Sequence, residues 1–273
     1  MRARAGDPDL PARSQASLAI SADGARWSLL GASPDLRDQL ARFPGLHPRP
    51  GTRDLPLDAV LLANAEIDHV LGLLVLRDAL SYRILSTPWV RDALLGHNAA
   101  FRLLSAVWTG VPLDAPFALD RDGHLEARLF PVPAKLPAHL VGLVSTAAGT
   151  SAGVRVTDLR SQKRLVVLPG LPRLDGGTLA ELEAADCRVV DGTFWRADEL
   201  RALRPGAPDA FAMGHLPIDG PGGSLATLAK LSGRTVYFHM NGTNPVLDPS
   251  SLEAAHVRSA GLAIAADGEE FEA

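Results

Sequence analysis

The sequence predicts a mixed α/β fold in which two β-sheets pack together and helices cover the outside. Three observations lead to this fold class. Short apolar strands with turns open the chain, helices and strands alternate towards its end, and neither an internal repeat nor a low-complexity linker divides it. We therefore expect one domain over residues 1–273.

The composition is that of a globular chain with a substantial core. Of the 273 residues, 47% are hydrophobic and 21% are charged, and the net charge of −4 argues against a nucleic-acid or anionic-membrane surface. No apolar run has the length of a membrane span, and residues 1–15 lack the apolar core of a signal peptide, so we expect a cytoplasmic protein. The single cysteine, Cys187, excludes an intrachain disulfide and a thiolate zinc cage.

The first part of the chain predicts a hairpin followed by strands and helices. Residues 16–21 and 27–30 flank the turn 22–24, and Ser33 before Pro34 indicates a helix N-cap. Residues 37–43 continue that helix, and the elements expected next are a buried strand over 57–63, a helix over 69–79, a strand over 82–86 and a helix over 88–95.

The middle and final parts predict further strands and then alternating elements. Residues 106–135 have the Pro/Gly turns of an antiparallel sheet, with 127–132 as its clearest strand, and residues 154–157 and 164–168 predict a second hairpin. The elements expected after it are a helix over 179–185 with Thr178 as N-cap, a strand over 187–190, helices over 198–204 and 224–231, a strand over 235–239, a helix over 250–259 and a strand over 262–265.

Four apolar strands end in carboxylate, histidine or amide side chains. Strand ends at one edge of a sheet are where loops converge to form a site. Any single cluster is weak evidence, and three have a structural explanation: Asp68 could cap a helix, Asp191-Gly192 could form a turn, and His239 could be a hydrogen-bonded core histidine. Their coincidence favours a site; the clusters are residues 64–69, 189–195, 212–217 and 236–245.

The ligand types in these clusters are oxygen and imidazole, without sulfur. Two histidines and one carboxylate with open positions suit non-heme Fe(II) and oxygen chemistry. A hydrolytic zinc site more usually has three protein ligands drawn mainly from histidine. Residue types alone leave the metal open; the candidates are Asp68, His69, Asp191, His215 and His239.

Residues 64–69 have the spacing of the His-x-His-x-Asp-His signature of the metallo-β-lactamase superfamily. Asn64 and Glu66 stand in place of the first two histidines, and Asp68 and His69 match the last two positions. The surrounding sequence resembles one branch of that superfamily, the pyrroloquinoline quinone (PQQ) synthesis protein B family. The matching segments are residues 12–17, 31–37, 66–69, 168–171, 191–195, 213–215 and 239–245, of which 191–195 and 239–245 are the more specific.

The chain departs from the family pattern in two places. Family members usually begin with a strand, a glycine-rich loop and a Cys-x-Cys-x-x-Cys zinc cluster, and this chain starts just after that point. We therefore expect a fold that lacks this strand and cluster, either through a misplaced start codon or in a truncated paralogue. Residues 150–153 contain no histidine where hydrolytic relatives place a metal ligand, which disfavours a two-zinc hydrolase.

The resemblance implies an αββα four-layer sandwich with a metal at the sheet edge. It implies Asp68, His69 and His239 as ligands, and Asp191 as a further ligand or a hydrogen-bonding partner of one. The other implied site residues are His215 as proton shuttle or substrate contact, Glu66 as fourth ligand or base, and Trp195, Asn241 and Asn244 on the substrate side, where the two asparagines could also orient the loop.

The function implied by the resemblance is an oxygen-using hydroxylase in PQQ biosynthesis. It would hydroxylate the tyrosine ring of a glutamate–tyrosine-derived precursor, with Fe(II) as cofactor and Zn(II) as the alternative. Two other functions stay open: a non-catalytic PQQ carrier or degenerate paralogue, and a zinc hydrolase of the wider superfamily. The expected partner is a small-molecule or short-peptide-derived substrate, with no nucleic acid and no membrane, and a homodimer is a possible assembly.

Overall fold

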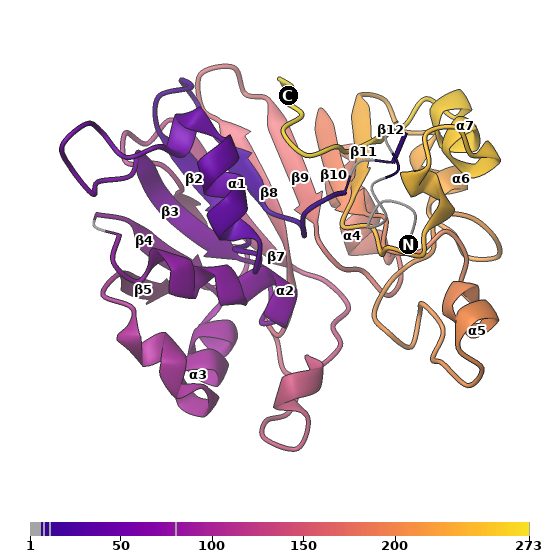
Figure 1. Cartoon of the computed structure of the whole chain (residues 1–273), viewed down its shortest axis with the longest axis horizontal. Coiled ribbons are helices and arrows are strands. Elements are labelled where there is room, and N and C mark those ends of the chain that lie inside the picture. Colours follow the sequence, from indigo (N-terminus) through magenta and orange to yellow (C-terminus); the bar gives the residue numbers. More distant parts are fainter. Residues whose placement is uncertain (1–6, 8, 11, 80, 273) are drawn as a thin grey trace. The chain divides into compact units, whose positions relative to one another are not determined.

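A computed structural model describes residues 7, 9–10, 12–79 and 81–272 of the chain. These residues form two compact units, Gln15–Lys163 and Arg164–Ala273, the latter together with the N-terminal segment up to Ser14 (Figure 1). Part of the predicted polar N-terminus, residues 1–6, 8 and 11, lies outside the described residues. The expectation of one domain over the whole chain stays a prediction.

The unit Gln15–Lys163 contains, in its described part, a five-stranded sheet of order β1-β2-β3-β4-β5. The predicted N-terminal hairpin is confirmed, because β1 (Leu18–Ile20) pairs antiparallel with β2 (Trp27–Leu30). The strands that follow are parallel to one another: β3 (Leu57–Leu62), β4 (Arg83–Ser86) and β5 (Val107–Gly110).

The parallel pairing of β5 corrects the expectation that the antiparallel sheet begins near residue 106. Between β4 and β5 the chain forms α3 (Pro88–His97) and η4 (Ala99–Leu103), and a helical crossover returns the next strand parallel to the first. The antiparallel pattern begins later, in the strands β6 (Pro116–Ala118), β7 (Leu125–Pro131) and β8 (Ala152–Asp158).

Helices of this unit pack against the five-stranded sheet through one apolar core (Figure 1). Leu36 of α1 (Leu36–Arg42) and Leu94 of α3 share this core with Val60 of β3. The alternate residues of β3 are buried too, so the strand is buried on both faces. The short helices η2 (Pro44–Leu46) and η5 (Ala138–Leu140) complete the unit.

Two predicted N-caps are wrong. The residue before α1 is Asp35, and Ser33 instead donates its hydroxyl to Gln39 Oε1 at 3.1 Å. The helix predicted after residue 178 begins earlier, and its cap is Asp175, whose carboxylate accepts the Thr178 N–H at 2.8 Å. In both cases a neighbouring residue occupies the cap position.

The predicted helix over 69–79 is also corrected. The chain forms a short α2 (Ile67–Val70) and then the 3-10 helix η3 (Leu71–Leu76). Gly72 donates its N–H to Ala32 O at 2.9 Å, and a Cβ at this position would overlap the Ser33 carbonyl. This close approach fixes the path of the backbone just after Asp68 and His69.

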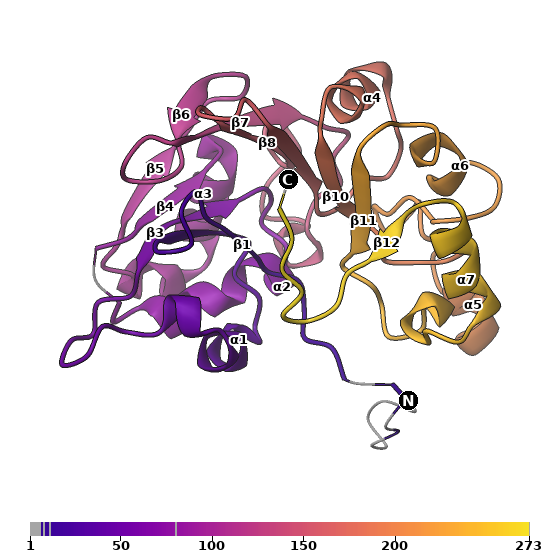
Figure 2. The same cartoon turned by 90° about the horizontal axis from the view of Figure 1, so that it is seen from above.

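The unit Arg164–Ala273 is built on parallel strands, of which β10, β11 and β12 lie side by side in Figure 2. The predicted alternation is confirmed by β9 (Arg164–Leu168), α4 (Gly176–Glu183), β10 (Cys187–Asp191), α5 (Glu199–Leu203), α6 (Leu225–Leu228), β11 (Arg234–Phe238), η6 (Pro245–Leu247), α7 (Leu252–Ser259) and β12 (Ala263–Ile264). Among the helices of the described residues, none combines the length and apolar character needed to cross a membrane.

A buried arginine anchors β10. The side chain of Arg188 is 0% exposed and donates to Leu182 O at 2.5 Å, Ala185 O at 2.7 Å and Ser232 O at 2.6 Å. Leu182 and Ala185 lie at the C-terminal end of α4, where a cation complements the helix dipole. The strand that carries Asp191 is thus tied to its neighbours at its start.

We expect Gly72→Ala to destabilise the protein by about 1–3 kcal/mol, because its Cβ overpacks against backbone. The measurement is the midpoint of urea unfolding. Gly96→Ala is the matched control: it lies in α3 with nothing within 4 Å of the added Cβ, and should stabilise by about 0.5–1 kcal/mol. A Gly72→Ala protein as stable as wild type would contradict the proposed close approach.

Candidate functional site

Asp191 and His239 lie together because two parallel strands end in register. Asp191, the last residue of β10, is paired with Phe238, the last residue of β11, and His239 follows directly. Gly192 then donates its N–H to Phe238 O at 2.8 Å. The polar side chains at these two strand ends therefore converge, as the sequence predicted.

The Asp191 carboxylate is the centre of a buried polar cluster. Its Oδ2 is 2.7 Å from His215 Nδ1, and its Oδ1 is 3.4 Å from His239 Nδ1. The hydroxyl of Thr193 donates to the same Oδ1 at 2.5 Å. The two imidazole rings stack, with centroids 5.6 Å apart and planes at 27°. Asp191 is 4% exposed, so these contacts replace water around the carboxylate.

The Asp191 carboxyl group is ionised in this environment. Burial by itself would raise its pKa, but the charges of His215 and His239 and their hydrogen bonds outweigh burial and hold the pKa well below its usual range. An ionised carboxylate only accepts hydrogen bonds. The Nδ1 of His215 therefore carries a proton, and in the neutral ring its Nε2 is the atom left for a metal or a substrate proton.

The cluster has the residue composition of a divalent-metal site. Ligand atoms of Asp191, His215 and His239 all lie within 4.8 Å of one another. Two imidazoles and one carboxylate fit both Zn(II) and Fe(II). The structure thus brings together two predicted ligands, Asp191 and His239, and places beside them His215, which the sequence assigned to the substrate side.

The loop after His239 is clamped to the segment after Asp191. His239 itself has φ +58°, the left-handed region, where the chain turns out of β11. Asn241 donates its N–H to Thr193 O at 3.0 Å, and Asn244 Nδ2 donates to Gly192 O at 2.8 Å. The Asn244 Oδ1 accepts the Val246 N–H at 3.1 Å. The side chain of Asn244 therefore orients the loop, one of its two predicted roles.

A half-buried carboxylate supports the same loop from α5. Glu199 Oε2 accepts the Trp195 N–H at 2.7 Å, and Oε1 accepts the Thr243 hydroxyl. The Trp195 ring is buried and lies 5.9 Å from the His256 ring of α7. Substrate contacts by Trp195, Asn241 and Asn244 stay predictions.

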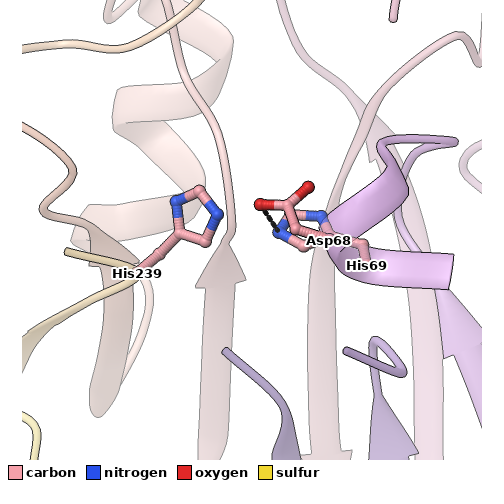
Figure 3. Close-up of side chains that lie close together, drawn as sticks. All are labelled: Asp68, His69 and His239. Carbon is pink, nitrogen blue, oxygen red and sulfur yellow. Dashed lines mark ion pairs between the residues drawn. The ribbon is translucent and has the colours of Figure 1, made fainter. Parts of the chain in front are cut away.

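A second polar cluster lies at the end of β3. Asn64 Oδ1 accepts the Glu66 N–H at 3.0 Å and lies 2.9 Å from His69 Nδ1. Because the backbone N–H is an obligatory donor, this atom is the amide oxygen, and His69 Nδ1 must donate to it. On the other side of the ring, His69 Nε2 is 3.9 Å from Asp68 Oδ2, the ion pair dashed in Figure 3.

Asp68 is not a helix cap. The N-cap position of α2 is Glu66, and Asp68 lies inside the first turn. Figure 3 draws Asp68 and His69 on α2 together with His239, which follows β11. The ligand set Asp68, His69 and His239 draws on both units of the chain and stays a prediction, as does the role of Glu66 as fourth ligand or base.

Two residues of these clusters are missing from the sequence-predicted site. Thr193 contacts Asp191, His215 and His239, and Asn64 holds His69. Thr193 stands two residues after Asp191, and Asn64 occupies a signature position that normally holds a histidine. The position of each beside a predicted ligand was the available signal, but a hydroxyl and an amide do not by themselves suggest metal chemistry.

The chain is similar in sequence to a known superfamily domain and to proteins of one name. A family model described as the beta-lactamase superfamily domain matches residues 26–240. Coenzyme PQQ synthesis protein B of Pseudomonas paraeruginosa is 38% identical over 268 residues, which cover 95% of this chain and 88% of that protein. The protein of the same name from Gluconacetobacter diazotrophicus is 39% identical over 279 residues, covering 98% of this chain and 90% of that protein.

A solved structure is similar over the whole chain. The crystal structure of Zn²⁺-bound PqqB from Methylobacterium extorquens is 36% identical, with a TM-score of 0.92 and coverage of 100% of this chain and 92% of that one. Together with the superfamily match, this similarity confirms the predicted α/β class and metallo-β-lactamase fold.

We expect Asn64→Leu to destabilise the protein by about 1–3 kcal/mol, because it leaves the buried His69 Nδ1–H without its acceptor. Urea unfolding measures this loss. Asn64→Asp keeps an acceptor at the same place and should retain the hydrogen bond to His69 in ¹⁵N-edited NMR spectra. Equal stability of the Leu variant and wild type would contradict the role of Asn64.

We expect the stability of Glu199→Gln relative to wild type to rise with pH. Burial raises the pKa of Glu199, with hydrogen bonds from Thr243 and Trp195 opposing it. A raised folded-state pKa means that wild type loses stability as pH rises through that pKa, whereas the glutamine variant does not. Urea unfolding from below about pH 4.3, the ordinary pKa of glutamate, to neutral pH measures the difference. Glu183→Gln, exposed at the end of α4, is the carboxylate-to-amide control.

Proposed function

Because the chain belongs to the coenzyme PQQ synthesis protein B family, within the beta-lactamase superfamily, we propose that it acts in the synthesis of pyrroloquinoline quinone. We further propose a metal-dependent, oxygen-using hydroxylation of the tyrosine ring of a glutamate–tyrosine-derived precursor. The observation that supports this activity best is the ionised Asp191 held between two imidazoles that it can orient toward a metal and a substrate.

The proposed metal ligands are His239 and Asp191 with the predicted Asp68 and His69. The relative from Methylobacterium extorquens is described as Zn²⁺-bound. Zinc in a relative does not decide the functional metal. Nitrogen and oxygen sites generally bind Zn²⁺ more tightly than Fe²⁺, whichever metal their reaction uses. We propose Fe(II) for hydroxylation, with Zn(II) as the alternative.

A bound Fe(II) with open positions would supply the activation of dioxygen. The residues of the chain supply orientation and proton transfer. Asp191 accepts the Nδ1–H of His215 at 2.7 Å, which leaves His215 Nε2 to take a proton from the phenol of the substrate. The ionised carboxylate would stabilise the imidazolium that results. His215 thus keeps its predicted role as proton shuttle.

The proposed partner is the small-molecule or short-peptide-derived substrate, and formation of a homodimer stays a prediction. Ring hydroxylation places one oxygen atom of O₂ in the product and releases the other as water, so two electrons must come from an added reductant. The buried, oxygen- and nitrogen-only cluster around Asp191 is compatible with this chemistry.

The test uses the full chain purified without oxygen, loaded with Fe(II), and given a tyrosine-derived glutamate–tyrosine cross-linked substrate with a reductant. We expect dioxygen uptake and a product that carries one labelled oxygen atom. His239→Ala and Asp191→Asn should lower the rate by at least about 100-fold, because each loses a ligand or the group that orients one. His97→Ala, an exposed histidine at the end of α3, should keep the wild-type rate.

Three outcomes contradict the hydroxylase. Equal rates for wild type and His239→Ala would show that the metal cluster does not act. Hydrolysis with added zinc but no dioxygen uptake would favour the hydrolase. Tight binding of PQQ with neither activity would favour the carrier.

A further inference from the structure

We propose that Thr193 is a positioning residue that holds the His239 imidazole with its proton on Nδ1, so that Nε2 is available to the metal. Thr193 would act through His239 and would not itself touch the reacting atoms. The statement that Nε2 of His239 serves a metal, and the zinc-affinity measurement below, rest on the proposed metal role of His239. The hydrogen-bond pattern stands without that role.

The hydroxyl of Thr193 lies at the centre of the Asp191 cluster. Its Oγ1 is 2.5 Å from Asp191 Oδ1, 2.9 Å from His239 Nδ1 and 3.0 Å from His215 Nδ1. It is also 3.0 Å from the backbone oxygen of His239. Thr193 is 6% exposed, so its partners in the cluster replace water.

Counting protons fixes the direction of these hydrogen bonds. A hydroxyl has one proton to donate and two lone pairs to accept with. The Asp191 carboxylate and the His239 carbonyl only accept, and the shorter contact of 2.5 Å indicates that the hydroxyl proton goes to Asp191. The single Nδ1 proton of His215 goes to Asp191 at the shorter distance of 2.7 Å. A lone pair of the Thr193 hydroxyl is then left for His239, so His239 Nδ1 donates to Thr193.

Asp191 alone cannot accept the Nδ1–H of both imidazole rings. It reaches His215 Nδ1 at 2.7 Å but His239 Nδ1 only at 3.4 Å, near the limit of a hydrogen bond. Thr193, at 2.9 Å, is the closer acceptor for His239. Removal of the hydroxyl should therefore release His239 selectively and leave His215 in place.

Thr193 also supports the backbone next to His239. His239 has a left-handed φ of +58°, a conformation that costs energy for a residue other than glycine. The Thr193 carbonyl accepts the N–H of Asn241 at 3.0 Å, and so holds the loop just after His239. Thr193 thus fixes both the ring and the turn of the same residue.

The test compares Thr193→Val, which removes the hydroxyl and keeps the shape, with Thr193→Ser, which keeps the hydroxyl. Thr235→Val, a buried threonine of β11, is the control for the substitution itself. The first measurement is the histidine tautomer by ¹⁵N NMR in the metal-free full chain. The second is the zinc affinity by competition with a chelator.

We expect wild type and Thr193→Ser to show protonated Nδ1 at both His215 and His239. Thr193→Val should lose that pattern at His239 only and bind zinc about 10–100-fold more weakly. The Thr235→Val control should match wild type in both measurements.

Two results would overturn the proposal. Wild-type His239 with its proton on Nε2 would refute it even if no variant folds. A folded Thr193→Val protein with unchanged zinc affinity and an unchanged His239 tautomer would refute it as well. Neither measurement uses dioxygen or the precursor, so failure of the hydroxylase would leave this result standing.

Discussion

The buried negative charge of Asp191 is the constraint on which the candidate site depends. A carboxylate that is 4% exposed must be compensated by hydrogen bonds and positive charge, or it would be protonated. His215, His239 and Thr193 supply that compensation. Each of them is thereby held in one orientation, since its Nδ1 or hydroxyl is committed to the centre. A pre-oriented cluster of this kind needs little rearrangement to receive a cation, which is how rigid sites gain affinity.

Hydrogen bonds also hold the loops around the Asp191 cluster in place. Asn244 and Asn241 join the loop after β11 to the segment after β10, and Glu199 joins both to α5. At the other end of β10, Arg188 binds carbonyls at the end of α4. The strand is therefore fixed at its start by a buried cation and at its end by a buried anion. In the other unit, Asn64 holds His69 by the same chemistry, an acceptor oxygen on Nδ1.

Much of the fold could be predicted from the sequence, because apolar runs and turn residues mark strands such as β3 and β10 locally. The two wrong N-caps were local errors, since Asp35 and Asp175 near the predicted residues hold the cap positions. Two further errors came from contacts distant in sequence: Gly72 against Ser33, and the crossover that makes β5 parallel. For the site, residue types with metal chemistry were found from strand ends, and Asp191 and His239 do meet. Thr193 and Asn64 could not be found this way, because their roles depend on which ring nitrogen they face.

The register of β10 against β11 sets a limit on how this chain can change in length. Asp191 is paired with Phe238 in parallel strands, so inserting or deleting one residue within 187–190 would turn the carboxylate to the opposite face of the sheet. The exposed stretch around residues 204–206 has no such partner strand in the described chain, and can gain or lose residues without moving Asp191. Length variation among functional relatives should therefore gather in such loops and avoid the strand that ends in Asp191.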